Sequence, residues 1–97
     1  MGRLYCVYIM TNRYNTVLYT GLTNDLQCRV LEHKNGKGGA FTKRYNIYKL
    51  VYFQVTNRIQ DVITEEKRIK GGSRQKKIDL VNGMNPEWTD LFEEYFG

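Results

Sequence analysis

The chain has 97 residues, of which 41% are hydrophobic and 26% are charged, and it contains a single proline. This composition is typical of one folded domain with a modest core, and it excludes a second catalytic lobe, a disordered chain and a collagen-like repeat. No apolar run approaches the roughly 20 residues that span a bilayer, and the N-terminus lacks the hydrophobic stretch of a signal peptide. We therefore expect one cytoplasmic domain over residues 1–97, and we expect it to be a monomer.

The charge of the chain is unevenly distributed. Lys and Arg total 15 against 10 Asp and Glu, a net charge of +5 at pH 7. Four of the acids, Glu87, Asp90, Glu93 and Glu94, lie in the last eleven residues, which contain no Lys or Arg. A basic body with an acidic C-terminal segment favours a polyanionic partner, nucleic acid first and a membrane surface second. A solvated surface that is merely basic explains the charge alone equally well.

Cysteine and histidine usage argues against a structural zinc site. Cys6 and Cys28 are far apart in the chain, no Cys-x-x-Cys pair occurs, and His33 is the single histidine. A structural zinc ion needs a full set of such ligands. We expect both cysteines to be reduced thiols packed in or near the core.

The first predicted elements are two strands. Residues 4–10 and 17–22 are rich in aromatic and β-branched side chains and flank a polar segment, which is typical of an antiparallel hairpin. Tyr8 and Tyr19 share one face of this hairpin if the register permits. The later elements follow from helical spacing, caps and glycine stops: a helix from residue 26 to 35, a flexible stretch over 37–40, a strand over 48–55, a helix over 59–70, a helix from 73 to 83, and a last helix that opens at Asn85-Pro86.

Glu66 occupies an unexpected position on its predicted helix. At about 100° per residue it falls inside the apolar arc formed by Val62, Ile63 and Ile69, whereas Glu65 falls on the rim. Burial of an unpaired carboxylate costs several kcal/mol, so Glu66 needs a cation beside it. Both a salt bridge near the helix end and a metal ion satisfy this need.

Arg29 and His33 are four residues apart and project from the same side of their predicted helix. A guanidinium aligned with an imidazole can donate several hydrogen bonds to one phosphate. The alternative is that Arg29 and His33 are ordinary surface side chains without a binding role. The chain also has eight tyrosines, and because a buried phenol needs a hydrogen-bond partner, we expect some of these hydroxyls to face a polar cleft.

Together these residues resemble a known family. Tyr8 in Cys-Val-Tyr and Tyr19 in Tyr-Thr-Gly, followed by Arg29 and His33 on one helix and by Glu66 on a later one, are similar to the motifs of the GIY-YIG endonuclease domain. The resemblance covers nearly the whole chain in the same order, and it is closest to the small stand-alone bacterial members. The first motif keeps only its Tyr, and the second has Thr where the family has Ile.

The resemblance implies an α/β (α+β) fold in which a three-stranded antiparallel sheet is flanked by helices, and the predicted elements agree with it. The single domain covers residues 1–97, with an acidic C-terminal helix over 85–97. The implied activity is hydrolysis of phosphodiester bonds in DNA, or in another nucleic acid, by a metal-dependent endonuclease. One divalent cation, Mg²⁺ or Mn²⁺, is expected to be held by the Glu66 carboxylate, waters and substrate oxygens.

The resemblance assigns catalytic roles to Tyr8, Tyr19, Arg29, His33 and Glu66. The two tyrosines activate and orient the attacking water, and which of them takes the proton stays open. An unperturbed phenol is only about 0.1% ionised at pH 7, so we expect the metal and Arg29 to favour the phenolate. His33 hydrogen-bonds one phenol, and Arg29 binds the scissile phosphate.

Basic residues on the two sides of the cleft are expected to grip the phosphates without reading the sequence. They are Lys34, Lys37, Lys43, Arg44, Lys67, Arg68, Lys70, Arg74, Lys76 and Lys77. Relatives such as UvrC carry extra DNA-binding domains, and this chain has no residues left for one. Specificity is therefore expected from nucleic-acid shape or from a protein partner, and no membrane partner is expected.

Two other functions stay open. A non-catalytic nucleic-acid-binding module would keep a nuclease fold for its basic face. A protein-interaction domain would use the acidic segment around Trp88 and Phe92. The sequence alone does not distinguish an active nuclease from a binding module, because the presence of catalytic side chains does not prove turnover.

Overall fold

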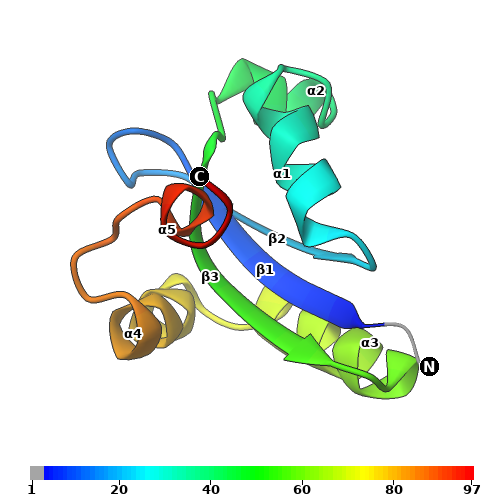
Figure 1. Ribbon diagram of the computed structural model, residues 1–97. Helices are drawn as coiled ribbons and strands as arrows, with labels where there is room; N and C mark the ends of the chain where they lie inside the picture. The colour runs from blue at the N-terminus through cyan, green and yellow to red at the C-terminus, as the bar shows by residue number, and fades with distance from the viewer. Residues whose placement is uncertain (1–3) are drawn as a thin grey trace.

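The computed structural model describes residues 4–97. Its elements, in chain order, are β1 (Tyr5–Thr11), β2 (Leu18–Thr23), α1 (Leu26–Lys34), α2 (Ala40–Arg44), β3 (Lys49–Thr56), α3 (Ile59–Lys70), α4 (Arg74–Met84) and α5 (Leu91–Phe96). The strands form one antiparallel sheet in the order β2-β1-β3, so β1 is central (Figure 1). Among the described residues, no helix has the length and apolar character that crossing a membrane requires.

The register of the β1–β2 hairpin places the two motif tyrosines on one face of the sheet. Tyr8 pairs with Gly21, and Met10 pairs with Tyr19. Since side chains directly opposite each other in an antiparallel pair point to the same face, Tyr8 and Tyr19 share a face. The prediction of a shared face is confirmed.

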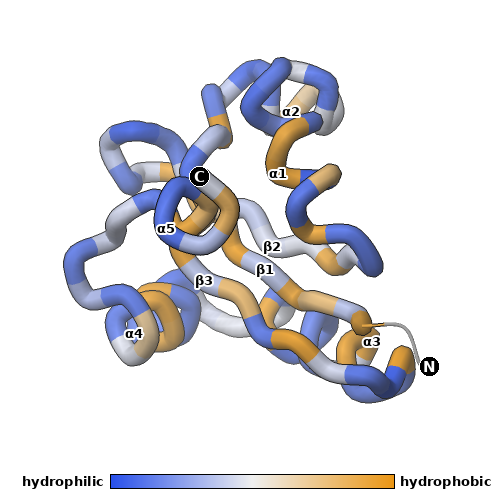
Figure 2. Tube along the Cα trace, viewed as in Figure 1, coloured by the Kyte–Doolittle hydropathy of each residue, from blue (hydrophilic) through white to orange (hydrophobic). Residues whose placement is uncertain are grey.

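Each face of the sheet is covered by different helices, because side chains along β1 alternate. Cys6, Tyr8 and Met10 of β1 pack with residues of α1 and α5. Val7 and Ile9 point the other way and pack with residues of α3 and α4. Figure 1 shows α5 in front of the sheet and α3 behind it, and Figure 2 shows hydrophobic segments along the strands where these helices meet them.

The segment expected to be flexible, residues 37–40, leads directly into the short helix α2, so that expectation is wrong at its C-terminal end. Gly36 and Gly39 have positive φ values of 74° and 128°, which lets the chain turn between α1 and α2. Thr42 is 3% exposed and Ile47 is fully buried. Tertiary burial of these two residues therefore stabilises a helix that the glycine-rich sequence conceals.

The last helix begins at Leu91, not at Asn85-Pro86 as its sequence suggests. The Asn85 side chain donates hydrogen bonds to the backbone carbonyls of Val51 and Thr89, at 3.2 and 2.8 Å, which ties this segment to β3 as a loop. Asp90 is the N-cap of α5 and accepts a hydrogen bond from the Phe92 backbone N–H. A tertiary contact thus overrides a local helix signal.

Two aromatic residues of the acidic C-terminal segment, Phe92 and Trp88, pack against the rest of the molecule. Phe92 is 8% exposed and belongs to the cluster of buried side chains around Tyr8. Trp88 is half-buried, and its indole N–H donates a hydrogen bond to Asn82 at 2.7 Å. The two aromatic residues that suggested a protein-interaction site are therefore used for packing.

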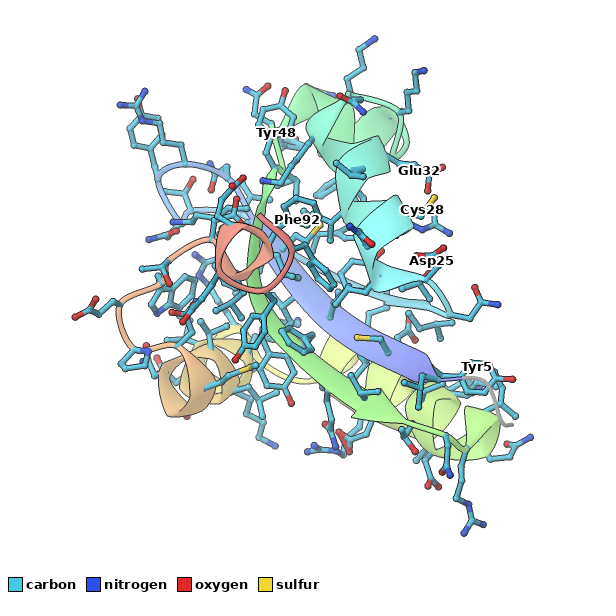
Figure 3. All side chains as sticks on the ribbon, viewed as in Figure 1. Tyr5, Asp25, Cys28, Glu32, Tyr48 and Phe92 are labelled. Atoms are coloured by element: carbon cyan, nitrogen blue, oxygen red, sulfur yellow. The ribbon has the colours of Figure 1, made fainter. Side chains whose placement is uncertain are left out.

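Both cysteines are free thiols, as expected, but only one of them is in the core. Cys6 is buried, and burial raises the pKa of its thiol to about 12. Cys28 is exposed and projects outward from α1, beside Glu32 and Asp25 (Figure 3). The expectation of a packed thiol is wrong for Cys28, because it lies on the solvent side of α1.

Candidate active site

Three of the predicted site residues meet on the face of the sheet that α1 covers. The ring centroids of Tyr8 and Tyr19 are 6.4 Å apart, and that of His33 lies 6.1 Å from Tyr8 and 5.5 Å from Tyr19. The Tyr8 hydroxyl and His33 Nε2 share a hydrogen bond of 3.4 Å. A β-hairpin and the helix that follows it therefore build one cluster of two phenols and an imidazole.

Two glycines allow this cluster to pack closely. A Cβ atom on Gly21 would lie 2.5 Å from the Tyr8 hydroxyl, and one on Gly38 would lie 2.2 Å from His33 Nδ1. Only a residue without a side chain leaves room for these two contacts. The glycine of the Tyr-Thr-Gly motif is thus explained by the tyrosine that lies against it on the neighbouring strand.

Tyr8 is buried to 2% exposure, and this changes its expected chemistry. Burial raises the pKa of the Tyr8 phenol well above its usual range, and the nearby Tyr19 raises it further. Arg29 lowers that pKa, as expected, but its effect is smaller than that of burial. Arg29 therefore acts in the expected direction, but burial outweighs it and the net effect is a raised pKa for Tyr8.

His33 is also buried, at 2% exposure. Burial lowers the pKa of its imidazole, and the neighbouring Arg29 guanidinium lowers it further. Its Nδ1 atom is buried without a hydrogen-bond partner among the described residues. His33 is therefore a neutral side chain that holds Tyr8, and the geometry does not support a direct contact between its ring and a substrate phosphate.

Arg29 is a cation near this cluster, because its charge lowers the pKa of both Tyr8 and His33. Its side chain is 43% exposed, and Nε lies 3.8 Å from the Glu32 carboxylate on the same helix. A pair with this exposure contributes little to stability and exchanges readily. Arg29 can therefore turn from Glu32 to a phosphate oxygen.

Glu66 lies on α3, which covers the opposite face of the sheet. Val62, Glu66 and Ile69 follow one side of α3, and Val62 and Ile69 are buried. The Glu66 side chain is 16% exposed, and its Oε2 atom lies 3.3 Å from Lys70 Nζ. Glu66 thus faces the core side with a cation beside it, as the sequence indicates, and Lys70 is that cation.

The position of α3 determines on which side of the sheet Glu66 lies relative to the tyrosine cluster. Helix α3 packs mainly against β2 and β1, and β2 is an edge strand. Tyr19 extends from one face of β2, and α3 lies against the other. The contact that involves the Glu66 carboxylate is with Lys70 and not with a tyrosine. The expected site residues therefore fall into two groups, separated by β2.

The donor set limits the kind of metal site that this chain can form. Within residues 4–97 there is no group of three or more His, Cys, Asp or Glu side chains that could hold a metal ion. Magnesium is commonly bound by one or two carboxylates together with waters and substrate phosphates. Glu66 fits this mode, because its present partner, Lys70, is 60% exposed and easily displaced.

The predicted basic residues differ in whether they form ion pairs within the molecule. Arg68 forms two hydrogen bonds of 2.8 Å with Glu65, and these lower the pKa of that carboxyl group. Lys34 pairs with Asp90 and Glu93 of the C-terminal segment, and its side chain is 22% exposed. Lys34 therefore anchors α5 to α1, a role that its sequence position does not reveal.

The remaining predicted cations are exposed or partly exposed on two sides of the molecule. Lys70 pairs with Glu66, Arg74 donates a hydrogen bond to the Asn15 carbonyl, and Lys77 donates one to the Gly72 carbonyl. The others carry no ion pair within residues 4–97: they are Lys37, Lys43, Arg44, Lys67 and Lys76. Arg68, Lys76 and Lys77 line a surface pocket between α3 and α4.

Sequence reasoning missed the aromatic residues of α2. The Phe41 ring centroid lies 6.2 Å from that of Tyr19 and 4.8 Å from that of Tyr45. Their spacing of four residues within a basic segment was the available signal. It was hidden because residues 37–40 suggest a flexible stretch and not the start of a helix.

Comparisons with known proteins agree with this architecture. A family model described as the GIY-YIG catalytic domain matches residues 4–79. The UPF0213 protein CPE1444 of Clostridium perfringens is 36% identical over 76 residues, which are 78% of this chain and 81% of that protein. The UPF0213 protein SSP2268 of Staphylococcus saprophyticus is 37% identical over 65 residues, 67% of this chain and 79% of that protein.

A solved structure extends the similarity to the fold. The solution NMR structure of the UPF0213 protein BH0048 from Bacillus halodurans is 26% identical, with a TM-score of 0.59, and the match covers 97% of this chain and 99% of that one. This confirms the three-stranded antiparallel sheet with helices. Family membership suggests nuclease-type chemistry and, in general, interaction with nucleic acid. The chain belongs to the GIY-YIG catalytic-domain family, as one of its small UPF0213 members.

Proposed function

We propose that this protein is a metal-dependent endonuclease that hydrolyses phosphodiester bonds in DNA. The observation that carries the proposal is the cluster of Tyr8, Tyr19 and His33 together with the partly exposed Arg29, whose charge acts on Tyr8 and His33. A half-buried phenol together with a partly exposed guanidinium on the helix that follows suits an in-line attack of water on a phosphate. The match to the GIY-YIG catalytic domain supports this chemistry.

The two tyrosines have different roles in this proposal. Tyr19 is half-buried, so its phenolic oxygen can contact and orient the attacking water, and in the phenolate form it can accept the proton of that water and become a neutral phenol. Tyr8 is buried and stays protonated, so it acts by holding Tyr19 and His33 in place. Arg29 leaves Glu32 to bind the scissile phosphate and to stabilise the charge that develops on it.

Glu66 supplies the single carboxylate that would hold the Mg²⁺ or Mn²⁺ ion. A bound divalent cation would stabilise the developing negative charge on the phosphate and lower the pKa of a bound water. Glu66 lies on α3, which packs against the edge strand that carries Tyr19. A nucleic-acid backbone that crosses the edge of β2 can therefore contact both groups of site residues.

The experiment that tests this function measures cleavage of labelled single-stranded, flapped and duplex DNA, and of RNA, with Mn²⁺ and with EDTA. We expect the wild type to cut only with Mn²⁺, and Glu66→Gln to lower the rate about 100-fold. Glu65→Gln is the matched control, because it changes the neighbouring carboxylate on the rim of the same helix, and it should cut at nearly the wild-type rate. A Glu66→Gln variant as active as the wild type would refute the assignment.

A non-catalytic nucleic-acid-binding module is the second candidate. The observation that favours it is the burial of Tyr8 and His33, which leaves Tyr19 as the accessible phenol of the cluster. Binding of nucleic acid without cleavage of any substrate in the same experiment would establish this second function in place of the first.

A further inference from the structure

An exposed pair of aromatic side chains lies beside the candidate active site. Phe41 is 49% exposed and Tyr45 is 39% exposed, and their ring centroids are 4.8 Å apart. Phe41 also lies 6.2 Å from Tyr19, which in turn lies 5.5 Å from His33. A row of rings therefore runs from the buried cluster through Tyr19 to the surface of α2.

The packing of α2 does not explain these exposed rings. The buried residue of this helix is Thr42, at 3% exposure. Phe41 and Tyr45 are four residues apart, so they project together from another side of the helix. Two large rings left partly in water next to a polar site are typical of a surface that binds a partner.

The charge around the two rings indicates which partner fits. Residues 37–49 contain Lys37, Lys43, Arg44 and Lys49 and no Asp or Glu. The Arg44 guanidinium carbon lies 5.5 Å from the centroid of the Tyr45 ring. Aromatic rings interleaved with cations bind single-stranded nucleic acid, because bases stack on the rings while phosphates contact the cations.

We propose that Phe41 and Tyr45 form a stacking platform for unpaired bases, and that the preferred substrate is single-stranded nucleic acid or the unpaired arm of a branched one. The proposal rests on the proposed function, because it names the substrate class of the same site. A base stacked on Phe41 lies next to Tyr19 and so delivers its backbone to the cleavage residues. A regular duplex offers no free base face to these rings.

The test measures binding in the absence of divalent metal, so that cleavage does not interfere. Fluorescence anisotropy is recorded with a labelled single-stranded oligonucleotide and with the matching duplex. Phe41→Ala should weaken binding of the single strand about tenfold, the size of one lost base–aromatic stack. Its affinity for the duplex should not change, and neither should the slope of log affinity against log salt, because no charge is removed.

Controls separate stacking from general effects. Phe41→Trp retains a ring and should bind the single strand at least as tightly as the wild type. Tyr14→Ala removes a ring that is 74% exposed and has the Arg13 guanidinium carbon 5.7 Å from its centroid, but that lies in the loop between β1 and β2. It should leave binding unchanged. Circular dichroism of each variant checks that the fold is retained.

Two outcomes would refute the stacking platform, and they differ in whether the proposed nuclease function is also refuted. Equal single-strand binding by Phe41→Ala, Tyr45→Ala and the wild type, or an equal loss for the duplex, refutes the platform and leaves the proposed nuclease function intact. No binding of any nucleic acid by the wild type at low salt refutes both. In that case the exposed rings belong to a protein interface.

Discussion

Tyr8 and Tyr19 lie on one face of the sheet in different environments. Tyr8 is buried and its pKa is raised, whereas Tyr19 is half-buried and adjoins the surface ring of Phe41. Tyr19→Phe should therefore lower the single-turnover cleavage rate by about 100-fold, as loss of a proton-accepting group does. Tyr8→Phe should lower that rate about tenfold or less, while it lowers the free energy of unfolding by about 1 kcal/mol through loss of its hydrogen bond. The reverse order of rates would contradict the assignment.

His33 makes stability depend on pH in a defined direction. Its pKa is lower in the folded protein than the value of about 6.5 expected for an unfolded chain. The unfolded state therefore binds the proton more tightly, so the stabilisation is present above pH 6.5 and is lost as pH falls below it. Urea unfolding of the wild type should show a decrease in stability from pH 7 to pH 5 that is smaller in His33→Gln. Equal decreases would show that His33 is not the titrating group.

The Tyr8 ring restricts position 21 of the Tyr-Thr-Gly motif to glycine. Its position leaves no room for a Cβ atom against the Tyr8 ring, so Gly21→Ala should destabilise the fold by about 1–3 kcal/mol through overpacking. Gly83→Ala is the matched control, because nothing lies within 4 Å of its Cβ position and α4 is helical there. It should stabilise by about 0.5–1 kcal/mol. Urea titration measures both changes, and a destabilised Gly83→Ala together with a neutral Gly21→Ala would contradict this account.

At the residue scale, the sequence predicts which side chains share a face and not which are accessible. The alternation of the hairpin places Tyr8 with Tyr19, and helical spacing places Arg29 with His33. The burial of His33 depends on contact with Gly38 after the end of α1, a tertiary contact that spacing does not encode. The water-excluded environment of Tyr8, which raises the pKa of its phenol, could therefore not be predicted.

Helix α5 is joined to the rest of the molecule through Asp90. This carboxylate accepts hydrogen bonds from the backbone N–H groups of Leu50 and Phe92, at 3.2 and 3.1 Å, and pairs with Lys34. Asp90→Ala removes the N-cap and leaves the buried Leu50 N–H without that partner, so it should destabilise by about 2–4 kcal/mol. Thermal or urea unfolding measures the loss.

Glu93→Ala provides the control for this anchor. The Glu93 side chain is 67% exposed and lies 3.9 Å from Lys34, so its removal should cost less than about 0.5 kcal/mol. Asp90→Asn keeps a capping oxygen without the charge and should fall between the two. A loss for Asp90→Ala no larger than that for Glu93→Ala would show that the carboxylate is not the anchor.

At the scale of elements, long periodic segments are predicted well and short ones are not. The three strands and the helices α1, α3 and α4 follow from alternation, helical spacing and caps. Helix α2 is missed because glycines precede it and burial of Thr42 and Ile47 stabilises it. The start of α5 is misplaced because Asn85 bonds to β3 and caps the end of α4, whereas Asp90 caps the start of α5. Contacts between distant segments decide both cases.

At the scale of the whole molecule, the order of the motifs predicts the fold and the family. It does not predict that α1 and α3 cover opposite faces of the sheet, because that depends on the side to which each connection crosses. The candidate site is consequently divided by β2, with Tyr19 on one face of the sheet and α3, the helix that carries Glu66, against the other. The central claim is that these two groups act on a single phosphodiester.

A double-mutant cycle tests this claim most directly. Single-turnover cleavage of a labelled single-stranded oligonucleotide with Mn²⁺ is measured for the wild type, Tyr19→Phe, Glu66→Gln and the double variant. Residues that act as a unit on one bond give losses that do not add. We predict that the double variant is no slower than the slower single variant. Losses that multiply would show that Tyr19 and Glu66 act independently, and would contradict a single site across the edge of β2.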